Sequence, residues 1–159
     1  MFATKNNSSE GIRGKVVGLM NARLADCAAL GSRLKQAHRI VNSCRPMMKL
    51  DPLLDKINEE VEVYADAIAE RAVQMGSCDA VRDRMAAKGY VSGDCPDAGR
   101  EQVDAVPSLL AAFGKSAQKA ITEANDLGDP DTAELFTEVS RGIDRWLWFV
   151  ENRLQQSRQ

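Results

Sequence analysis

The stretch from Asp51 to Gly76 places the strongest constraint on how this chain can fold. It opens with Asp51-Pro52, a helix-capping residue followed by one suited to the first helical position, and it closes at Gly76, a natural helix stop. Apolar residues recur between them at intervals of three or four and predict one buried stripe: Leu54, Ile57, Val61, Tyr64, Ile68 and Met75. We therefore expect a helix of about seven turns, whose apolar stripe the remaining chain has to cover.

Acidic residues form a second stripe on the same predicted helix: Asp51, Asp55, Glu62, Asp66 and Glu70. Such a face is often only a solvated surface. In an exposed helix, a Lys or Arg four residues after an acid would form a stabilising pair with it. Here the residue four positions after Asp51 is Asp55, and the residue four positions after Asp66 is Glu70. These like charges would repel one another unless a cation lay between them.

The spacing of the acids limits where such a cation could bind. Asp55 and Asp66 lie about 16 Å apart along the helix axis, too far to hold one ion together. If two copies of the helix packed antiparallel about a twofold axis near Val61, the first pair of acids of one copy would face the second pair of the other. A cation site shared between subunits is thus the alternative to a solvated face.

Composition and charge narrow the class of protein. The 159 residues are 44% hydrophobic and only 5% aromatic, which suits a single helical domain. A net charge of −2 and the single lysine before the first predicted helix, Lys5, predict weak or absent DNA binding. No apolar run approaches the length of a membrane span and no signal core is present, so we expect a cytoplasmic protein without a membrane partner. The four cysteines have no CxxC spacing, and reduced thiols are expected.

Four long helices are predicted, the first from Glu10 to Val41 and the second from Asp51. Pro46 lies in the loop between them and predicts an antiparallel hairpin. A lone histidine at the end of an apolar face, as His38 is, can be a hydrogen-bonded core residue, but the hairpin brings it close to Asp51 and Asp55, which favours a ligand. A crossover from about 77 to 99 with a short helix over 79–88 can reach the far end of the bundle, so the second and third helices would run parallel. The third helix is expected from 100 to 127, with Pro107 either bending it or marking a later start.

The fourth helix opens at Asp129-Pro130 and runs to about Leu154, with this expected core face: Leu135, Val139, Ile143, Trp146 and Phe149. The domain organisation is then a disordered arm over 1–9, a four-helix bundle over 10–155 and a short tail over 156–159. Short, long and short connections match an all-α, ferritin-like four-helix bundle with a crossover carrying a short helix between the second and third helices. The usual di-iron site within one such bundle needs a histidine from each of two helices, and His38 is the only histidine, so that site is excluded.

Four runs of the sequence closely resemble the Dps family, the mini-ferritins: LKQAH at 34–38, DAIAERAVQMG at 66–76, LAAFGK at 110–115 and DLGDPDTAELFTEVSRGIDRWLWFVE at 126–151. The resemblance implies a hollow shell of twelve subunits that oxidises iron(II), preferentially with hydrogen peroxide, and stores the product. It also implies ferroxidase sites between twofold-related subunits, with iron as the metal.

Carried over by position, the resemblance makes His38 and Asp55 ligands from one subunit, and Asp66 and Glu70 ligands from its partner. The family's second histidine is replaced by Asp51. Two interpretations of Asp51 stay open: a carboxylate ligand that makes the site harder and more anionic, or only the N-cap of its own helix.

The residue after His38 also departs from the family, which usually has tryptophan where this chain has Arg39. In the family, the run of acids near the fourth helix lines negatively charged threefold pores, here Asp126, Asp129, Asp131 and Glu138. Alternatively, Asp129 and Asp131 are acids at the start of the fourth helix, where the positive end of the helix dipole favours them. Trp146 and Trp148 are expected to pack, one in the core and the other at an interface.

The function predicted from all of this is a Dps-type mini-ferritin that binds, oxidises and stores iron and so protects against oxidative stress. The alternative is a noncatalytic shell protein whose altered site binds another divalent metal or none.

Overall fold

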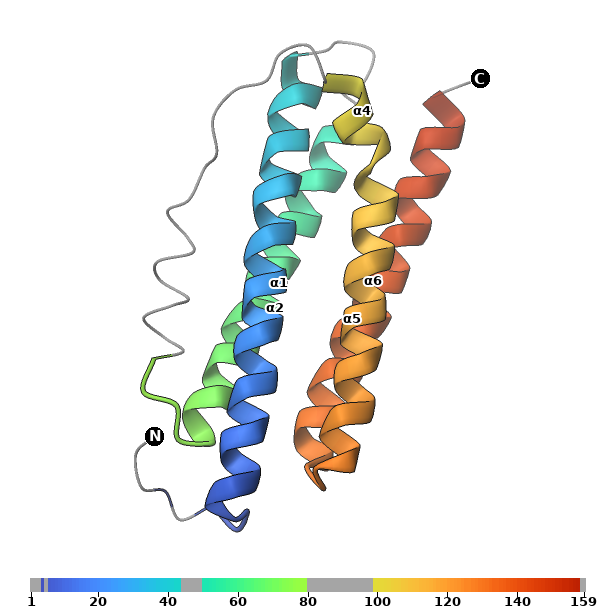
Figure 1. The fold of residues 1–159 in the computed structure, drawn as a ribbon. Helices are drawn as coiled ribbons and strands as arrows, with labels where there is room; N and C mark the ends of the chain where they lie inside the picture. The colour runs from blue at the N-terminus through green and yellow to red at the C-terminus, as the bar shows by residue number, and fades with distance from the viewer. Residues whose placement is uncertain (1–3, 5, 44–49, 80–98, 158–159) are drawn as a thin grey trace.

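The computed structural model describes residues 4, 6–43, 50–79 and 99–157. In these ranges the regular structure is helical throughout: α1 (Glu10–Ser43), α2 (Asp51–Gln74), α4 (Gly99–Asp104), α5 (Val106–Asp126) and α6 (Pro130–Ser157). Figure 1 shows α1 and α6 running in one direction and α2 and α5 in the other. The expected parallel arrangement of the second and third long helices is therefore confirmed, and the fold is all-α.

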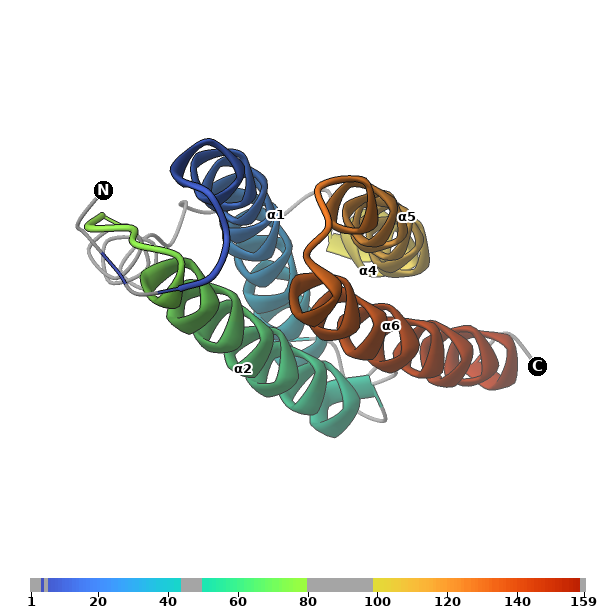
Figure 2. The same ribbon diagram turned by 90° about the horizontal axis from the view of Figure 1, so that it is seen from below.

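The four long helices pack around one shared interior. Helix α1 contacts α2 and α5, and α6 contacts α5 and α2. Figure 2, seen along the bundle from below, shows α1 and α2 as one neighbouring pair and α5 and α6 as the other. One face of the bundle is consequently made by α1 with α5, and the opposite face by α2 with α6.

The apolar stripe of α2 lies in the core as predicted. Leu54, Ile57, Val61 and Ile68 are almost completely buried, whereas Tyr64 is only partly buried because its hydroxyl group reaches a carboxylate. The predicted core face of α6 is partly wrong. Phe149 is 40% exposed, and the aromatic core residue of this helix is Phe136, at 1%. Since neighbouring helical positions differ by about 100°, the burial of Val150 turns Phe149 outward.

Glycines and prolines mark the helix ends much as the sequence indicated. Gly76 and Gly128 have φ angles of 99° and 73°, a conformation that strains other L-residues, and they follow the ends of α2 and α5. The third helix is not continuous: α4 ends at Asp104, and α5 begins at Val106 with Pro107 in its first turn. Pro107 thus marks the later start, because its missing N–H costs no helical hydrogen bond there.

The start of α1 and the end of α6 differ slightly from the prediction. Ser9 caps α1, since its hydroxyl oxygen accepts a hydrogen bond from Ile12 N at 3.3 Å. In the arm before it, Asn6 donates a side-chain hydrogen bond to Met75 Sδ at 3.5 Å, so this residue contacts the bundle. Helix α6 continues past Leu154 to Ser157. The predicted short helix over 79–88 lies almost entirely outside the described residues.

Among the described residues, no helix combines the length and the apolar character that crossing a membrane requires.

Candidate metal site

The first element of the site is the hairpin of α1 and α2, which places the end of one helix beside the start of the other. Val41 of α1 and Leu54 of α2 are buried and anchor this end of the hairpin in the core. His38 Nε2 lies 2.6 Å from Asp51 Oδ1, and both side chains are about one-third exposed. The predicted approach of His38 to Asp51 is therefore found, but His38 lies at the edge of the apolar face and not within the core.

The N-cap interpretation of Asp51 is wrong. The N-cap position of α2 is Leu50, Asp51 is the first helical residue, and no side chain caps this helix. Leu50 is 3% exposed, and the Asp51 carboxylate that follows it lies beside His38 of α1. Asp51 is thus free of the competing role that the sequence left open for it.

The hydrogen bonding around His38 does not satisfy all of its partners. Nε2 also lies 3.3 Å from the Asn42 side-chain amide nitrogen. An amide N–H needs a lone pair on Nε2, whereas the Asp51 carboxylate needs a proton there, and one nitrogen cannot supply both. Despite the short distance to His38, Asp51 Oδ1 is buried without a hydrogen bond of acceptable geometry. The 2.6 Å contact therefore joins two ligand-type atoms without a well-aligned N–H between them.

The His38 and Asp51 pair consists of two atoms of the kind that ligate divalent cations. Imidazole nitrogen and carboxylate oxygen are both ligands of iron(II), manganese(II) and zinc(II). A cation bound beside the pair would accept a lone pair from each atom. Because metal bonds to nitrogen and oxygen are about 2.0–2.2 Å long, the two side chains would move slightly apart to hold it. Asp55, one turn further along α2, is exposed and lies on the same side of the helix.

The other predicted ligands, Asp66 and Glu70, are exposed on the second half of α2. In the described part of a single chain, no three His, Cys, Asp or Glu side chains are close enough to hold a metal ion. The structure therefore brings His38 and Asp51 together and leaves Asp66 and Glu70 apart from them. The remaining acid of the stripe is Glu62. Its carboxylate lies 3.2 Å from Lys35 Nζ of α1, so this ion pair joins the two helices of the hairpin.

Arg39 follows His38 directly in the sequence. Arg39 is exposed at the next position of α1. Cys44, in the loop after α1, lies outside the described residues.

Comparison with known proteins agrees with this fold. Residues 17–159 match the family described as Ferritin-like domain. A "DNA protection during starvation protein" of Agrobacterium fabrum is 32% identical over 96% of this chain and 96% of its own length. A protein of the same name from Streptococcus suis is 24% identical over 87% of this chain and 83% of its own. The chain belongs to the Dps family of ferritin-like proteins.

A solved Dps structure supports the same fold. The Dps protein of Vibrio cholerae O1 superposes with a TM-score of 0.73 and 16% sequence identity, covering 97% of this chain and 99% of that one. It is described as a member of a broad superfamily of ferritin-like diiron-carboxylate proteins.

Of the four acids that the Dps resemblance assigns to a pore between subunits, Asp129 is buried and the other three are exposed, and the pore itself stays a prediction. Asp129 is 4% exposed and holds two helix ends together: Arg71 Nη2 of α2 lies 2.8 Å from its Oδ1, and Thr132 of α6 donates to both of its oxygens. This geometry supports the helix-capping interpretation of Asp129. Exposed acids remain at Asp126, Asp131 and Glu138.

Sequence reasoning missed a polar cluster between α2 and α6 of this Dps-family chain. Glu60 accepts hydrogen bonds from the Tyr64 hydroxyl group, from Trp146 Nε1 at 2.7 Å and from Arg145 Nη2 at 2.9 Å. Burial, together with the hydrogen bond to Glu60, raises the pKa of Tyr64. The Glu60 and Tyr64 spacing of four residues was the only signal in the sequence, and it does not indicate the contribution of α6.

The two tryptophans occupy the different environments that their spacing predicted. Trp146 is partly buried against the core and bonded to Glu60, whereas Trp148 is 60% exposed. Trp148 packs edge-on against Phe149, with ring centroids 5.0 Å apart. The interface expected at Trp148 stays a prediction.

Proposed function

We propose that this chain is a mini-ferritin subunit that binds iron(II) as a substrate, oxidises it with hydrogen peroxide or oxygen and stores iron(III) within a shell. Membership of the Dps family supports the class of protein. The observation that carries the proposal is the pair of His38 Nε2 and Asp51 Oδ1, 2.6 Å apart, with Asp55 exposed one turn further along α2. Protection against oxidative stress would follow, because the reaction consumes iron(II) and peroxide together.

The proposed site is shared between two subunits. One subunit supplies His38, Asp51 and Asp55, and the antiparallel α2 of its partner supplies Asp66 and Glu70. Asp55, Asp66 and Glu70 are exposed on α2, on the surface that a second copy would contact. A twofold contact is isologous, so each dimer would hold two equivalent sites.

The protein groups would bind and orient the iron, and the redox chemistry would belong to the metal and its oxidant. Peroxide or oxygen accepts the electrons that iron(II) loses. Carboxylate oxygens stabilise the higher charge of the oxidised ion more than imidazole does, so Asp51 in place of a histidine favours the product state. The neutral His38 nitrogen would keep the site from becoming wholly anionic.

Mixed dimers provide the direct test of a shared site. A His38→Ala, Asp55→Ala variant and an Asp66→Ala, Glu70→Ala variant should each lose iron oxidation. When the two are co-expressed, one site in every mixed dimer has both of its halves intact, so part of the activity should return. Mixed shells that mass spectrometry confirms but that show no recovery, under an assay in which the native protein is active, would contradict the intersubunit assignment.

A noncatalytic shell protein is the second candidate, because Asp51 stands where the family has an imidazole. Anaerobic titration with iron(II), followed by a pulse of peroxide, separates the two candidates. Stoichiometric binding and fast oxidation support the ferroxidase. Binding of manganese(II) or zinc(II) without iron oxidation supports the second candidate.

Assembly into a closed shell of about twelve subunits is part of the proposal, since the site is incomplete in one chain. Light scattering should give the mass of such a shell at micromolar protein. A stable monomer under these conditions would contradict both the shell and the shared site. The proposed place of action is the cytoplasm.

A further inference from the structure

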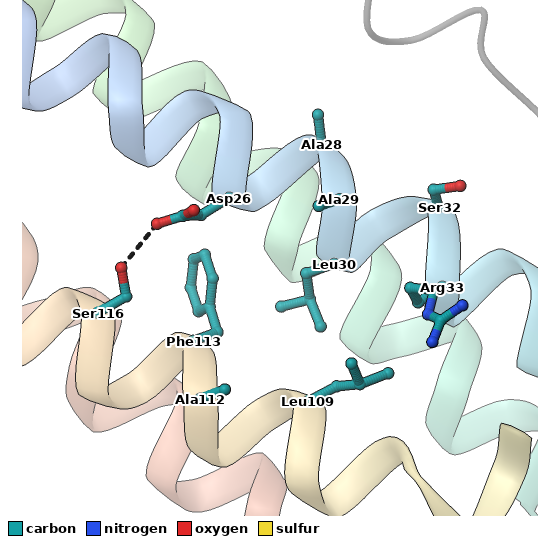
Figure 3. A pocket seen from close by; sticks show the side chains of 10 residues that line it. All are labelled: Asp26, Ala28, Ala29, Leu30, Ser32, Arg33, Leu109, Ala112, Phe113 and Ser116. Carbon is teal, nitrogen blue, oxygen red and sulfur yellow. Dashed lines mark hydrogen bonds between the residues drawn. The ribbon is translucent and has the colours of Figure 1, made fainter.

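A hollow of about 680 Å³ lies between α1 and α5, on the face of the bundle away from α2 and α6. Figure 3 shows its apolar lining, made by Leu30 of α1 with Leu109 and Phe113 of α5. Small side chains at its rim, including Ala29 and Ala112, leave it open to solvent. Its volume is within the range of small-molecule sites, which are typically apolar with a few polar groups that fix orientation.

The two ends of the hollow carry different charges. At one end the negative charge of Asp26 is compensated by its neighbours. Ser116 Oγ donates a hydrogen bond to Asp26 Oδ2 at 2.6 Å, and Arg23 Nε lies 3.0 Å from the same oxygen. At the other end lies Arg33, as Figure 3 shows. Within the described ranges, the Arg33 guanidinium has no hydrogen bond and no ion pair. The hollow therefore has one uncompensated charge, and it is positive.

We propose that this hollow binds a free medium-chain fatty acid, with the carboxylate on Arg33 and the alkyl chain directed toward Ser116. Arginine binds carboxylates through two parallel N–H groups, which would hold the ligand headgroup at the rim. The alkyl chain would lie over the exposed Ala29 and Ala112 and the partly exposed Leu109, and would remove their apolar surface from water.

The dimensions of the hollow select the chain length. Leu109 and Ser116 lie about 10 Å apart along α5, which is close to the length of an extended medium-chain alkyl group. The Asp26 and Ser116 hydrogen bond closes that end with polar atoms, so a longer chain would have to bring its apolar tail against them. A cationic amphiphile of the same length would meet Arg33 with like charge.

Equilibrium dialysis of the full-length protein with radiolabelled decanoate, below the concentration at which decanoate forms micelles, tests the proposal. We expect saturable binding of one decanoate per chain. Decanol and decyltrimethylammonium should bind at least about tenfold more weakly, a difference of about 1.4 kcal/mol. Absence of saturable decanoate binding, or equal binding of the three compounds, would overturn the proposal.

Variants locate the binding to this hollow. Arg33→Glu should weaken decanoate binding at least about tenfold and should strengthen that of decyltrimethylammonium. Ala112→Trp should abolish binding by filling the hollow, with circular dichroism confirming its helix content. Lys15→Glu is the matched control, an exposed charge reversal on the same helix but outside the hollow, and should leave binding unchanged. Decanoate binding that is unaltered in Arg33→Glu would place the ligand elsewhere and refute the assignment.

Discussion

Gly142 illustrates how a single residue can be required by a contact between two helices. A Cβ atom at this position of α6 would overlap the Tyr64 hydroxyl group and would lie 2.9 Å from Tyr64 Cζ and 3.0 Å from Glu60 Oε1. The close approach lets the hydroxyl group reach Glu60, which also accepts the Trp146 indole N–H. Glycine in a helix ordinarily costs stability, so its presence here reflects packing and not helix propensity.

Gly142→Ala should therefore destabilise the protein by about 1–3 kcal/mol, because Tyr64 has to move and lose its hydrogen bond. Chemical denaturation followed by circular dichroism measures the change. Gly18→Ala is the matched control, since a Cβ there meets nothing within 4 Å; it should stabilise by about 0.5–1 kcal/mol. Stabilisation by both substitutions would show that Tyr64 does not restrict position 142. Combining Gly142→Ala with Tyr64→Leu should reduce the cost.

Asp51→Asn tests the metal site at the same scale. The amide keeps the shape of the side chain but loses the negative charge, so iron(II) affinity in anaerobic titration should fall at least about tenfold. Asp144→Asn, an exposed acid on α6, is the control and should leave the affinity unchanged. Equal affinity of the Asp51 variant and the native protein would mean that Asp51 is not a ligand.

At the scale of elements, the end of α2 and the start of α6 are joined by one buried carboxylate. Asp129 accepts hydrogen bonds from Arg71 of α2 and from the backbone and hydroxyl group of Thr132. Because its side chain is only 4% exposed, water cannot replace these partners. Helix capping and helix–helix attachment thus depend on the same residue.

Asp129→Ala should lower the free energy of unfolding by about 2–4 kcal/mol, since it removes the cap of α6 and leaves the Arg71 guanidinium without its main partner. The neighbouring Asp131 is 77% exposed and 3.7 Å from Arg71, so Asp131→Ala should change stability by less than about 0.5 kcal/mol. Denaturation curves at one protein concentration provide the comparison. Similar losses from both substitutions would contradict the distinction between a buried cap and a surface acid.

At the scale of the whole molecule, charge argues against compaction of DNA by this protein. The net charge is −2, and the arm before α1 contains a single lysine, Lys5. Binding to DNA depends on the number of phosphates that lysines and arginines neutralise, and each arm would neutralise few.

Gel retardation of plasmid DNA at physiological salt should therefore show little or no binding. A variant with Asn6→Lys, Asn7→Lys and Ser8→Lys is the positive control, and it should retard the plasmid at low salt and release it as salt is raised. Retention of plasmid by the native protein at moderate salt would show the prediction to be wrong.

The sequence alone determined the helical class, the order of the long helices and most of the buried face of α2. These properties depend on local rules: a repeat near 3.6 residues sets which side chains share a face, and residues such as Pro107, Gly128 and Asp129 mark helix ends wherever they occur. The proximity of His38 to Asp51 also followed from local information, because a short loop forces consecutive helices to lie antiparallel. The family resemblance added candidate ligands beyond this.

Only the tertiary structure decided which side chains meet across helices. Periodicity gives the face of a helix but not its rotation against a neighbour, and a rotation of one position exchanges Phe149 for Val150 in the core. The rotation of α2 and its position along α1 place Asp51 beside His38 instead of over its own helix end. The rotation of α6 against α2 brings Trp146 to Glu60. Hydrogen bonds tolerate errors of only a few tenths of an ångström, and such distances are set by the packing of the whole core.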